Sequence, residues 1–259
     1  MKPQFIDVHA HVNFPDYDAD REDVIKRALD AGVWMINVGT DRESSRSAVA
    51  LAEKHPEGTY AIIGQHPTSE EDFDIDFYRT LAKSKKVVGI GECGLDFFRV
   101  THKEAQKKQE TTFRGQIDLA LELDLPLMIH CRNAYEETLA ILNEYKSKAG
   151  ERLRGNFHFF AGNIETAQKI LDLGFTISFT GVITFAREYE KLVQHIPLGF
   201  MMSETDCPYV TPVPNRGKKN EPLFVRDVVS KIAHIKNEDL EKVRVQLLKN
   251  TFTFFRLTA

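Results

Sequence analysis

The sequence predicts an α/β protein folded as a single (β/α)8 barrel of the TIM type. Eight short apolar segments alternate with helical segments along the chain, and strands that alternate with helices form parallel sheets. The chain has 259 residues, which suits a barrel of roughly 250 residues. No low-complexity linker or break in composition divides residues 1–259, so we expect one domain.

An open, doubly wound parallel sheet is the alternative architecture, because it uses the same alternation of strands and helices. That fold normally binds phosphate through a glycine-rich loop after its first strand. No such loop follows the first predicted strand here, and the barrel is therefore favoured.

Each predicted strand is a short apolar run bounded by turn residues. The first run, Phe5-Ile6-Asp7-Val8, leads into His9-Ala10-His11. The fourth ends in a carboxylate, and the fifth and sixth each end in a histidine. The eight strands are expected at 5–11, 33–38, 59–64, 86–92, 126–130, 155–158, 175–179 and 200–204.

The predicted helices carry apolar residues at spacings of three and four. In the first helix the apolar stripe of Val24, Ile25, Ala28 and Leu29 is closed by Gly32. Gly174 ends the sixth helix in the same way. Helices are expected at 21–31, 43–54, 73–83, 103–123, 135–145, 164–173, 187–194, 222–235 and 238–257.

Composition narrows the class of protein. The chain is 42% hydrophobic and 28% charged, which is typical of a globular protein with a substantial core. Its net charge of −4 gives no general attraction to nucleic acid, so anion binding would need a local cationic patch. Three scattered cysteines, the lack of a leader at the N-terminus and the lack of a membrane-length apolar run predict a cytoplasmic protein.

Potential metal ligands gather at the predicted strand ends, which meet at one mouth of a barrel. His9 and His11 are two residues apart on a strand and therefore share a face, with Asp7 deeper on that face. Imidazole and carboxylate are common ligands of divalent metals. The strand-end residues are His9, His11, His66, Glu92, His130, His158 and Asp206.

Each of these residues also has a purely structural interpretation. His130 could be a hydrogen-bonded core histidine, Glu92 a carboxylate paired with lysine at the rim, and Asp206 the cap of a turn. All of them coincide at one mouth, however, and a buried cluster of this kind without metal would be poorly compensated. A metal site is therefore the favoured hypothesis.

The chain resembles the TatD family of metal-dependent DNases along essentially its whole length. The motifs that carry the resemblance are Asp7-Val8-His9-Ala10-His11, Gly91-Glu92-Cys93-Gly94-Leu95-Asp96, His130-Cys131-Arg132, Glu204-Thr205-Asp206-Cys207-Pro208-Tyr209 and Arg216-Gly217-Lys218-Lys219-Asn220-Glu221-Pro222. The resemblance implies an amidohydrolase-like barrel with one to three divalent metals at its mouth.

The resemblance also implies a set of ligands. One metal would be held by His9, His11, Glu92 and Asp206, and Glu92 would bridge to a second metal held by His130 and His158. Two nearby cations need anionic charge between them, which a bridging carboxylate provides. Zinc, manganese and magnesium are all candidates, and iron also suits imidazole and carboxylate ligands.

Three segments depart from the family pattern. Asn133 stands where many members have aspartate. Phe159 and Ala161 stand in a segment that often reads His-Cys-Phe-Ser/Thr-Gly, and Thr68 stands where many members carry a second histidine past His-Pro. We expect these differences to affect the surroundings of the metals or the substrate cleft rather than the ligands.

The expected reaction is metal-assisted hydrolysis of DNA phosphodiesters, exonucleolytic and directed at single strands. Glu92 and Asp206 are the predicted catalytic residues, with Asp206 as general base. Asp7 and Glu204 are expected to orient the histidine rings or support the strand ends. The expected substrate contacts are His66, Arg132, Arg216, Lys218 and Lys219, with Phe97, Phe98 and Tyr209 available to stack on bases.

Other functions fit the same sequence. A lactonase or a small phosphoester hydrolase would use the same metals on the same scaffold. A non-catalytic, metal-stabilised binding protein fits less well, because a structural site usually closes with four ligands. The expected partner is DNA, with no membrane and no obligatory protein partner.

Overall fold

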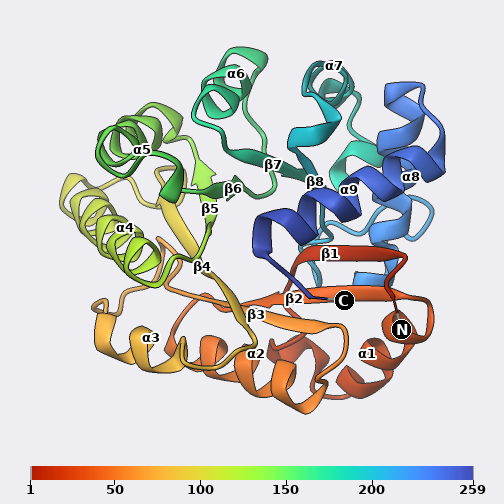
Figure 1. The fold of residues 1–259 in the computed structure, drawn as a ribbon, viewed down its shortest axis with the longest axis horizontal. Helices are drawn as coiled ribbons and strands as arrows, with labels where there is room; N and C mark the ends of the chain where they lie inside the picture. Colours follow the sequence, from red (N-terminus) through yellow and green to blue (C-terminus); the bar gives the residue numbers. More distant parts are fainter. Residues whose placement is uncertain (1, 259) are drawn as a thin grey trace.

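A computed structural model describes residues 2–258 and contains the expected barrel. Eight parallel strands follow one another around the sheet in chain order, with helices packed outside them (Figure 1). The strands are β1 (Phe5–Ala10), β2 (Val33–Val38), β3 (Thr59–Ile63), β4 (Val87–Asp96), β5 (Leu127–Arg132), β6 (Gly155–Phe157), β7 (Thr176–Phe179) and β8 (Met201–Ser203).

Helices connect the strands as the βα alternation requires. They are α1 (Arg21–Asp30), α2 (Arg42–Lys54), α3 (Ile75–Leu81), α4 (Lys103–Leu123), α5 (Tyr135–Ala149), α6 (Ile164–Asp172), α7 (Glu190–His195), α8 (Val225–Lys236) and α9 (Leu240–Phe255). Short 3-10 helices lie at Pro15–Tyr17, Gly150–Arg152, Gly181–Thr184, Arg187–Tyr189, Leu198–Phe200 and Pro222–Phe224. Within residues 2–258, no helix has both the length and the apolar character needed to cross a membrane.

The barrel closes between its first and last strands through very few hydrogen bonds. Ala10 and Cys207 form a parallel bridge. The N–H of His11 donates to the carbonyl of Cys207, and the N–H of Asp206 donates to the carbonyl of His9, both over 2.9 Å. These bonds fix the end of β1 against the segment that follows β8.

The apolar core has layers inside and around the sheet. Residues of six strands, among them Ile6, Val8 and Met202, form one cluster with Phe255 of α9. In Figure 1 this helix crosses in front of the strands. Two further clusters pack the sheet against the surrounding helices. Helix α9 thus covers apolar strand residues that would otherwise meet water.

The predicted end of the fourth strand, at Glu92, is wrong. Strand β4 continues to Asp96, and its register against β5 shifts between Ile90 and Cys93. The reason is local: Gly91 and Gly94 adopt φ of 151° and 137°, which side chains disfavour, and so let the strand bend and continue. Glu92 therefore lies inside the bend of a long strand.

Other expected boundaries shift by a few residues. Helix α5 runs to Ala149 rather than 145, and the expected helix at 187–194 is a 3-10 turn followed by α7. The expected helix at 222–235 likewise begins as a 3-10 turn. Several strands end one residue earlier, which places His11, His158 and Glu204 just beyond β1, β6 and β8.

We predict that Gly94→Ala strongly destabilises the barrel. A Cβ at Gly94 would lie 2.0 Å from the carbonyl oxygen of His130, at a φ of 137°. The substitution should lower the free energy of unfolding by at least about 2 kcal/mol, measured by urea denaturation.

Gly174→Ala is the matched control. Gly174 also has a positive φ, 76°, but a Cβ there would come no closer than 3.8 Å to any neighbour. This control should lose about 1 kcal/mol, the cost of the left-handed backbone alone. Equal losses for the two variants would show that β4 and β5 can separate to admit a side chain.

Candidate metal centre

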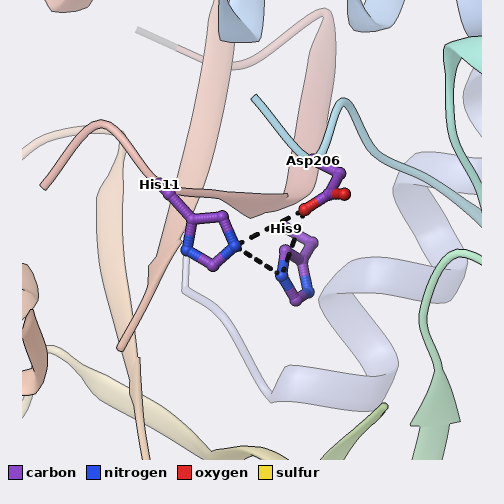
Figure 2. A group of neighbouring side chains, drawn as sticks. All are labelled: His9, His11 and Asp206. Carbon is purple, nitrogen blue, oxygen red and sulfur yellow. Dashed lines mark hydrogen bonds and ion pairs between the residues drawn. The ribbon is translucent and has the colours of Figure 1, made fainter. Parts of the chain in front are cut away.

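Three side chains from the first and last strands of the barrel, or just beyond them, form the first part of the site. His9 and His11 come from the end of β1 and Asp206 from the segment after β8, and they point toward one another (Figure 2). The two histidine Nε2 atoms are 3.1 Å apart, and Asp206 Oδ1 lies 3.8 Å from that of His9 and 3.5 Å from that of His11. The backbone bonds that close the barrel therefore also set this cluster.

Glu92 connects this group to a second one. Its Oε2 lies 3.4 Å from His9 Nε2 and 3.8 Å from His11 Nε2. Its Oε1 lies 2.9 Å from both His130 Nδ1 and His158 Nε2, which are themselves 3.4 Å apart. One carboxylate thus offers one oxygen to each pair of imidazoles.

The spacing of these atoms fits metal coordination. Ligands bound at 2.0–2.2 Å in a tetrahedron lie about 3.3–3.6 Å apart. The separations among the nitrogen and oxygen atoms on the Oε2 side of Glu92 run from 3.1 to 3.8 Å, and those on the Oε1 side from 2.9 to 3.4 Å. All six side chains are largely or fully buried, as a converging set of ligands should be.

The histidines around Glu92 and Asp206 keep these two carboxylates ionised. Burial raises the pKa of Glu92, but the charges of His158 and His66 and hydrogen bonds from His130 and His158 outweigh it, so this pKa is well below its usual value. Burial also raises the pKa of Asp206, but the hydrogen bond from His11 and the charges of nearby imidazoles outweigh it, so this pKa too is below its usual value. Ionised carboxylates are the form that binds a cation.

Three ligand-like histidines have a second partner on the far side of the ring. His11 Nδ1 is 2.9 Å from the carbonyl oxygen of Val38, and His158 Nδ1 is 3.4 Å from Glu204 Oε1. His130 Nε2 is 3.1 Å from Asp96 Oδ2. Such contacts fix the orientation of a ligand ring.

Asp96 was missed as a site residue by the sequence analysis. It lies within the Gly91–Asp96 motif, but beyond the expected end of the fourth strand at Glu92. It is fully buried at the end of β4, where its Oδ1 accepts the N–H groups of Phe98 and Arg99. Its position in the motif was the signal that could have identified it.

Glu204 and Asp7 play different parts in the structure. Glu204 Oε1 accepts the N–H of Phe159 at 2.7 Å, its Oε2 accepts the hydroxyl of Ser178, and it faces His158. Asp7 contacts no histidine ring in the described part of the chain. It accepts the N–H groups of His9 and Thr205, at 3.2 and 2.9 Å, and the Thr205 hydroxyl, and so ties β1 to the segment after β8.

The centre opens into a cavity of about 500 Å³. His66 and Arg132, both predicted substrate contacts, line this cavity. The Arg132 guanidinium lies 3.9 Å from the ring centre of the exposed Phe98. Arg99 lines the cavity too and was not predicted. Further lining residues, which include two of the family departures, are Phe159, Ala161, Tyr189 and Tyr209.

The other predicted substrate residues lie away from this lining. Arg216 donates to the carbonyl of Thr211 and stacks on Phe185, and Lys219 pairs with Asp20 at 2.6 Å. Lys218 is exposed. Phe97 is half-buried against the core rather than exposed at the mouth. The structure thus groups Arg132 and His66 with the centre, and leaves the loop at 216–219 apart from it.

Comparison with known proteins gives a consistent result. The family model described as TatD related DNase matches residues 6–256. A Bacillus subtilis (strain 168) protein named uncharacterized metal-dependent hydrolase YabD is 38% identical over 257 residues, covering 97% of this chain and 98% of that protein. A Pantoea vagans protein named 3'-5' ssDNA/RNA exonuclease TatD is 33% identical, covering 97% and 99%.

Solved structures agree. The crystal structure of YjjV, a TatD homologue from Escherichia coli K12, superposes with a TM-score of 0.90 at 28% sequence identity and covers 100% of both chains. The eight-stranded barrel is thus the fold of this structure as well.

We predict that Glu92→Gln disrupts the centre. The amide keeps the shape of the side chain but removes the negative charge between the two groups of imidazoles. Metal content, measured by elemental analysis, should fall by one ion per chain, or turnover should drop by orders of magnitude. Glu53→Gln on α2, which carries the same change outside the site, is the control; unchanged turnover and metal content in Glu92→Gln would make Glu92 structural only.

Proposed function

The chain belongs to the TatD-related DNase family of metal-dependent hydrolases, and we propose that it is a deoxyribonuclease that removes nucleotides from the end of single-stranded DNA. The observation that carries this proposal is a double set of ligand atoms sharing Glu92 beneath a cavity lined by two arginines. The name of the Pantoea vagans relative, a 3'-5' ssDNA/RNA exonuclease, supports the single-stranded and exonucleolytic parts. We assign the activity to residues 1–259 acting as one domain.

The chain uses divalent metal as the family does, and we propose two ions. His9, His11, Glu92 and Asp206 would hold one, and Glu92, His130 and His158 the other. Zinc, manganese and magnesium are the candidates, with zinc and manganese better suited to four imidazoles. When bound, such a pair lowers the pKa of a water molecule and neutralises charge on phosphoryl oxygens.

Asp206 is the proposed general base. Its carboxylate is held ionised, lies beside both histidines of β1 and borders the cavity, so it can accept a proton from an attacking water. Its backbone has a φ of 54°, and its N–H is bonded to the carbonyl of His9. A proton acceptor anchored in this way needs little reorganisation during the reaction.

The DNA strand is proposed to lie over the arginine side of the cavity. Arg132 and Arg99 offer charge to the phosphates, and His66, which lines the same cavity 3.4 Å from Glu92, would be a further phosphate contact. The exposed rings of Phe98 and Tyr209 provide surfaces on which unpaired bases can stack. Arg216, Lys218 and Lys219 would contact phosphates farther along the strand.

A hydrolase of lactones or small phosphoesters is the second candidate. The observation that favours it is the size of the cavity, about 500 Å³, which is within the range of small-molecule sites. Assays of the metal-loaded protein on end-labelled single-stranded DNA, a lactone and a simple phosphodiester separate the two candidates. Greater catalytic efficiency on the lactone than on DNA would replace the nuclease proposal.

We further propose a cytoplasmic location and no obligatory protein partner. The cysteines at 93, 131 and 207 are unpaired in the structure, as a reducing compartment favours. Fractionation of cells followed by immunodetection tests the location.

Removal of the metal should abolish hydrolysis. Treatment with a chelator takes away the charge that the six ligands converge on, so turnover of DNA should fall to background and return when zinc, manganese or magnesium is added. Metal content is measured in parallel. Full turnover by protein verified to be metal-free would contradict the proposed mechanism.

Substitution of the cationic residues should weaken the binding of DNA selectively. Arg99→Ala/Arg132→Ala and, separately, Arg216→Ala/Lys218→Ala/Lys219→Ala should each raise KM for an oligonucleotide. Each lost phosphate contact should flatten the log–log salt dependence by about 0.7. The triple variant should leave turnover of a minimal phosphodiester unchanged, because that substrate does not reach the loop.

Lys26→Ala/Lys169→Ala removes two charges on α1 and α6, outside the site, and controls for net charge in the double arginine variant; adding Lys242→Ala on α9 gives the matching three-charge control for the triple variant. If the triple variant has the KM and salt slope of its control, the loop is only a solvated turn. If the double arginine variant also matches its control, the strand does not follow the cavity.

A further inference from the structure

The hydrogen bonds of His66 fix which of its ring nitrogens carries the proton. Its Nδ1 lies 3.1 Å from the backbone nitrogen of Thr68 and 2.7 Å from the Thr68 hydroxyl oxygen. A backbone N–H can only donate, so Nδ1 accepts and cannot carry a proton. The proton of the neutral ring is therefore on Nε2, which lies 3.4 Å from Glu92 Oε1.

This polarity is opposite to that of His11. The Nδ1 of His11 faces the carbonyl oxygen of Val38, which can only accept, so that ring keeps its proton on Nδ1 and a free lone pair on Nε2. The outer nitrogens of His130 and His158 likewise face the carboxylates of Asp96 and Glu204. Histidines that bind metals usually donate their outer N–H in this way.

His66 nevertheless stands among the ligand-like atoms. With Glu92 and His130 it forms a group close enough to hold an ion, and it borders the same cavity as Arg132. Its Nε2–H, however, would have to be lost before that nitrogen could bind a metal. The same N–H is well placed to donate to an anionic oxygen in the cavity.

We propose that Thr68 is a positioning residue that holds His66 as an N–H donor, and that His66 donates from Nε2 to a non-bridging oxygen of the scissile phosphate instead of binding metal. The assignment to a phosphate rests on the proposed function. A fixed donor stabilises charge that develops on such an oxygen during hydrolysis.

Nitrogen NMR of the histidine rings tests the proposal directly. In protein with 15N-labelled histidine, two-bond proton–nitrogen spectra distinguish a protonated ring nitrogen from one with a lone pair. The His66 signals are assigned as those missing from His66→Ala. We expect a protonated Nε2 and an unprotonated Nδ1, both without metal and with diamagnetic Zn²⁺. A proton on Nδ1, or loss of the Nε2 proton when Zn²⁺ is added, would overturn the proposal.

Zinc content gives a second readout that needs no substrate. His66→Ala should bind as much zinc per chain as the wild type, whereas His130→Ala should bind less. A loss of zinc in His66→Ala equal to that in His130→Ala would make His66 a ligand. Because neither readout uses a substrate, both decide whether His66 is an N–H donor or a metal ligand even if the protein fails to cleave DNA.

Variants of Thr68 test its positioning role. Thr68→Val removes the hydroxyl but keeps the backbone N–H, and should lower kcat about fivefold with little change in KM, as expected for one lost hydrogen bond. It should also shift the averaged Nδ1 signal toward the protonated form. Thr68→Ser should restore both values. Wild-type kcat and ring signals in Thr68→Val would show that the hydroxyl does not position His66.

Discussion

The buried carboxylate of Glu92 is the constraint on which the rest of the site depends. An isolated carboxylate in this position would be expensive, because burial takes it out of water. Here three histidine nitrogens, from His66, His130 and His158, lie within 3.4 Å of its Oε1. Its Oε2 faces the histidines of β1. The single negative charge of Glu92 thus contacts side chains from β1, β5 and the segments after β3 and β6. Glu92 itself lies at the bend in β4.

Closure of the barrel between β1 and the segment after β8 positions the other part of the site. The bonds between β1 and the segment after β8 are few, yet they set the positions of His9, His11 and Asp206. Buried groups below reinforce them: Asp7 binds Thr205, and the Asn220 side chain donates to the carbonyl of Thr205 at 3.0 Å. Tyr17 donates in turn to the carbonyl of Asn220. Fold stability and the geometry of the proposed ligands therefore depend on the same hydrogen bonds.

The residues at the rim of the cavity are more exposed and make fewer contacts than those at its floor. The floor consists of buried groups whose neighbours leave them little freedom, whereas Arg99, Arg132 and Phe98 are exposed and bound by few contacts. Phe159 and Ala161, where the family often has polar residues, make the β6 side of the rim more apolar. Asn133 is exposed with a φ of 54°, a conformation that asparagine tolerates. The rim is thus the part of the site whose side chains are least constrained by their neighbours.

The sequence alone determined the barrel, the order and approximate position of its strands and helices, and the strand ends that bring the histidines together. Hydrophobic periodicity reports local structure, and parallel strands must converge at one mouth. The sequence could not place Glu92 inside a bent β4, because the positive φ angles of Gly91 and Gly94 and the shift in register against β5 cannot be read from the residue types. Nor could it show that Lys219 pairs with Asp20, far away in the chain, or that Asp96 lies behind His130. Such pairings depend on distances across the fold, which only the tertiary structure decides. The polarity of the His66 ring depends on the local backbone turn that brings the Thr68 N–H to Nδ1, and the residue types alone do not give that turn.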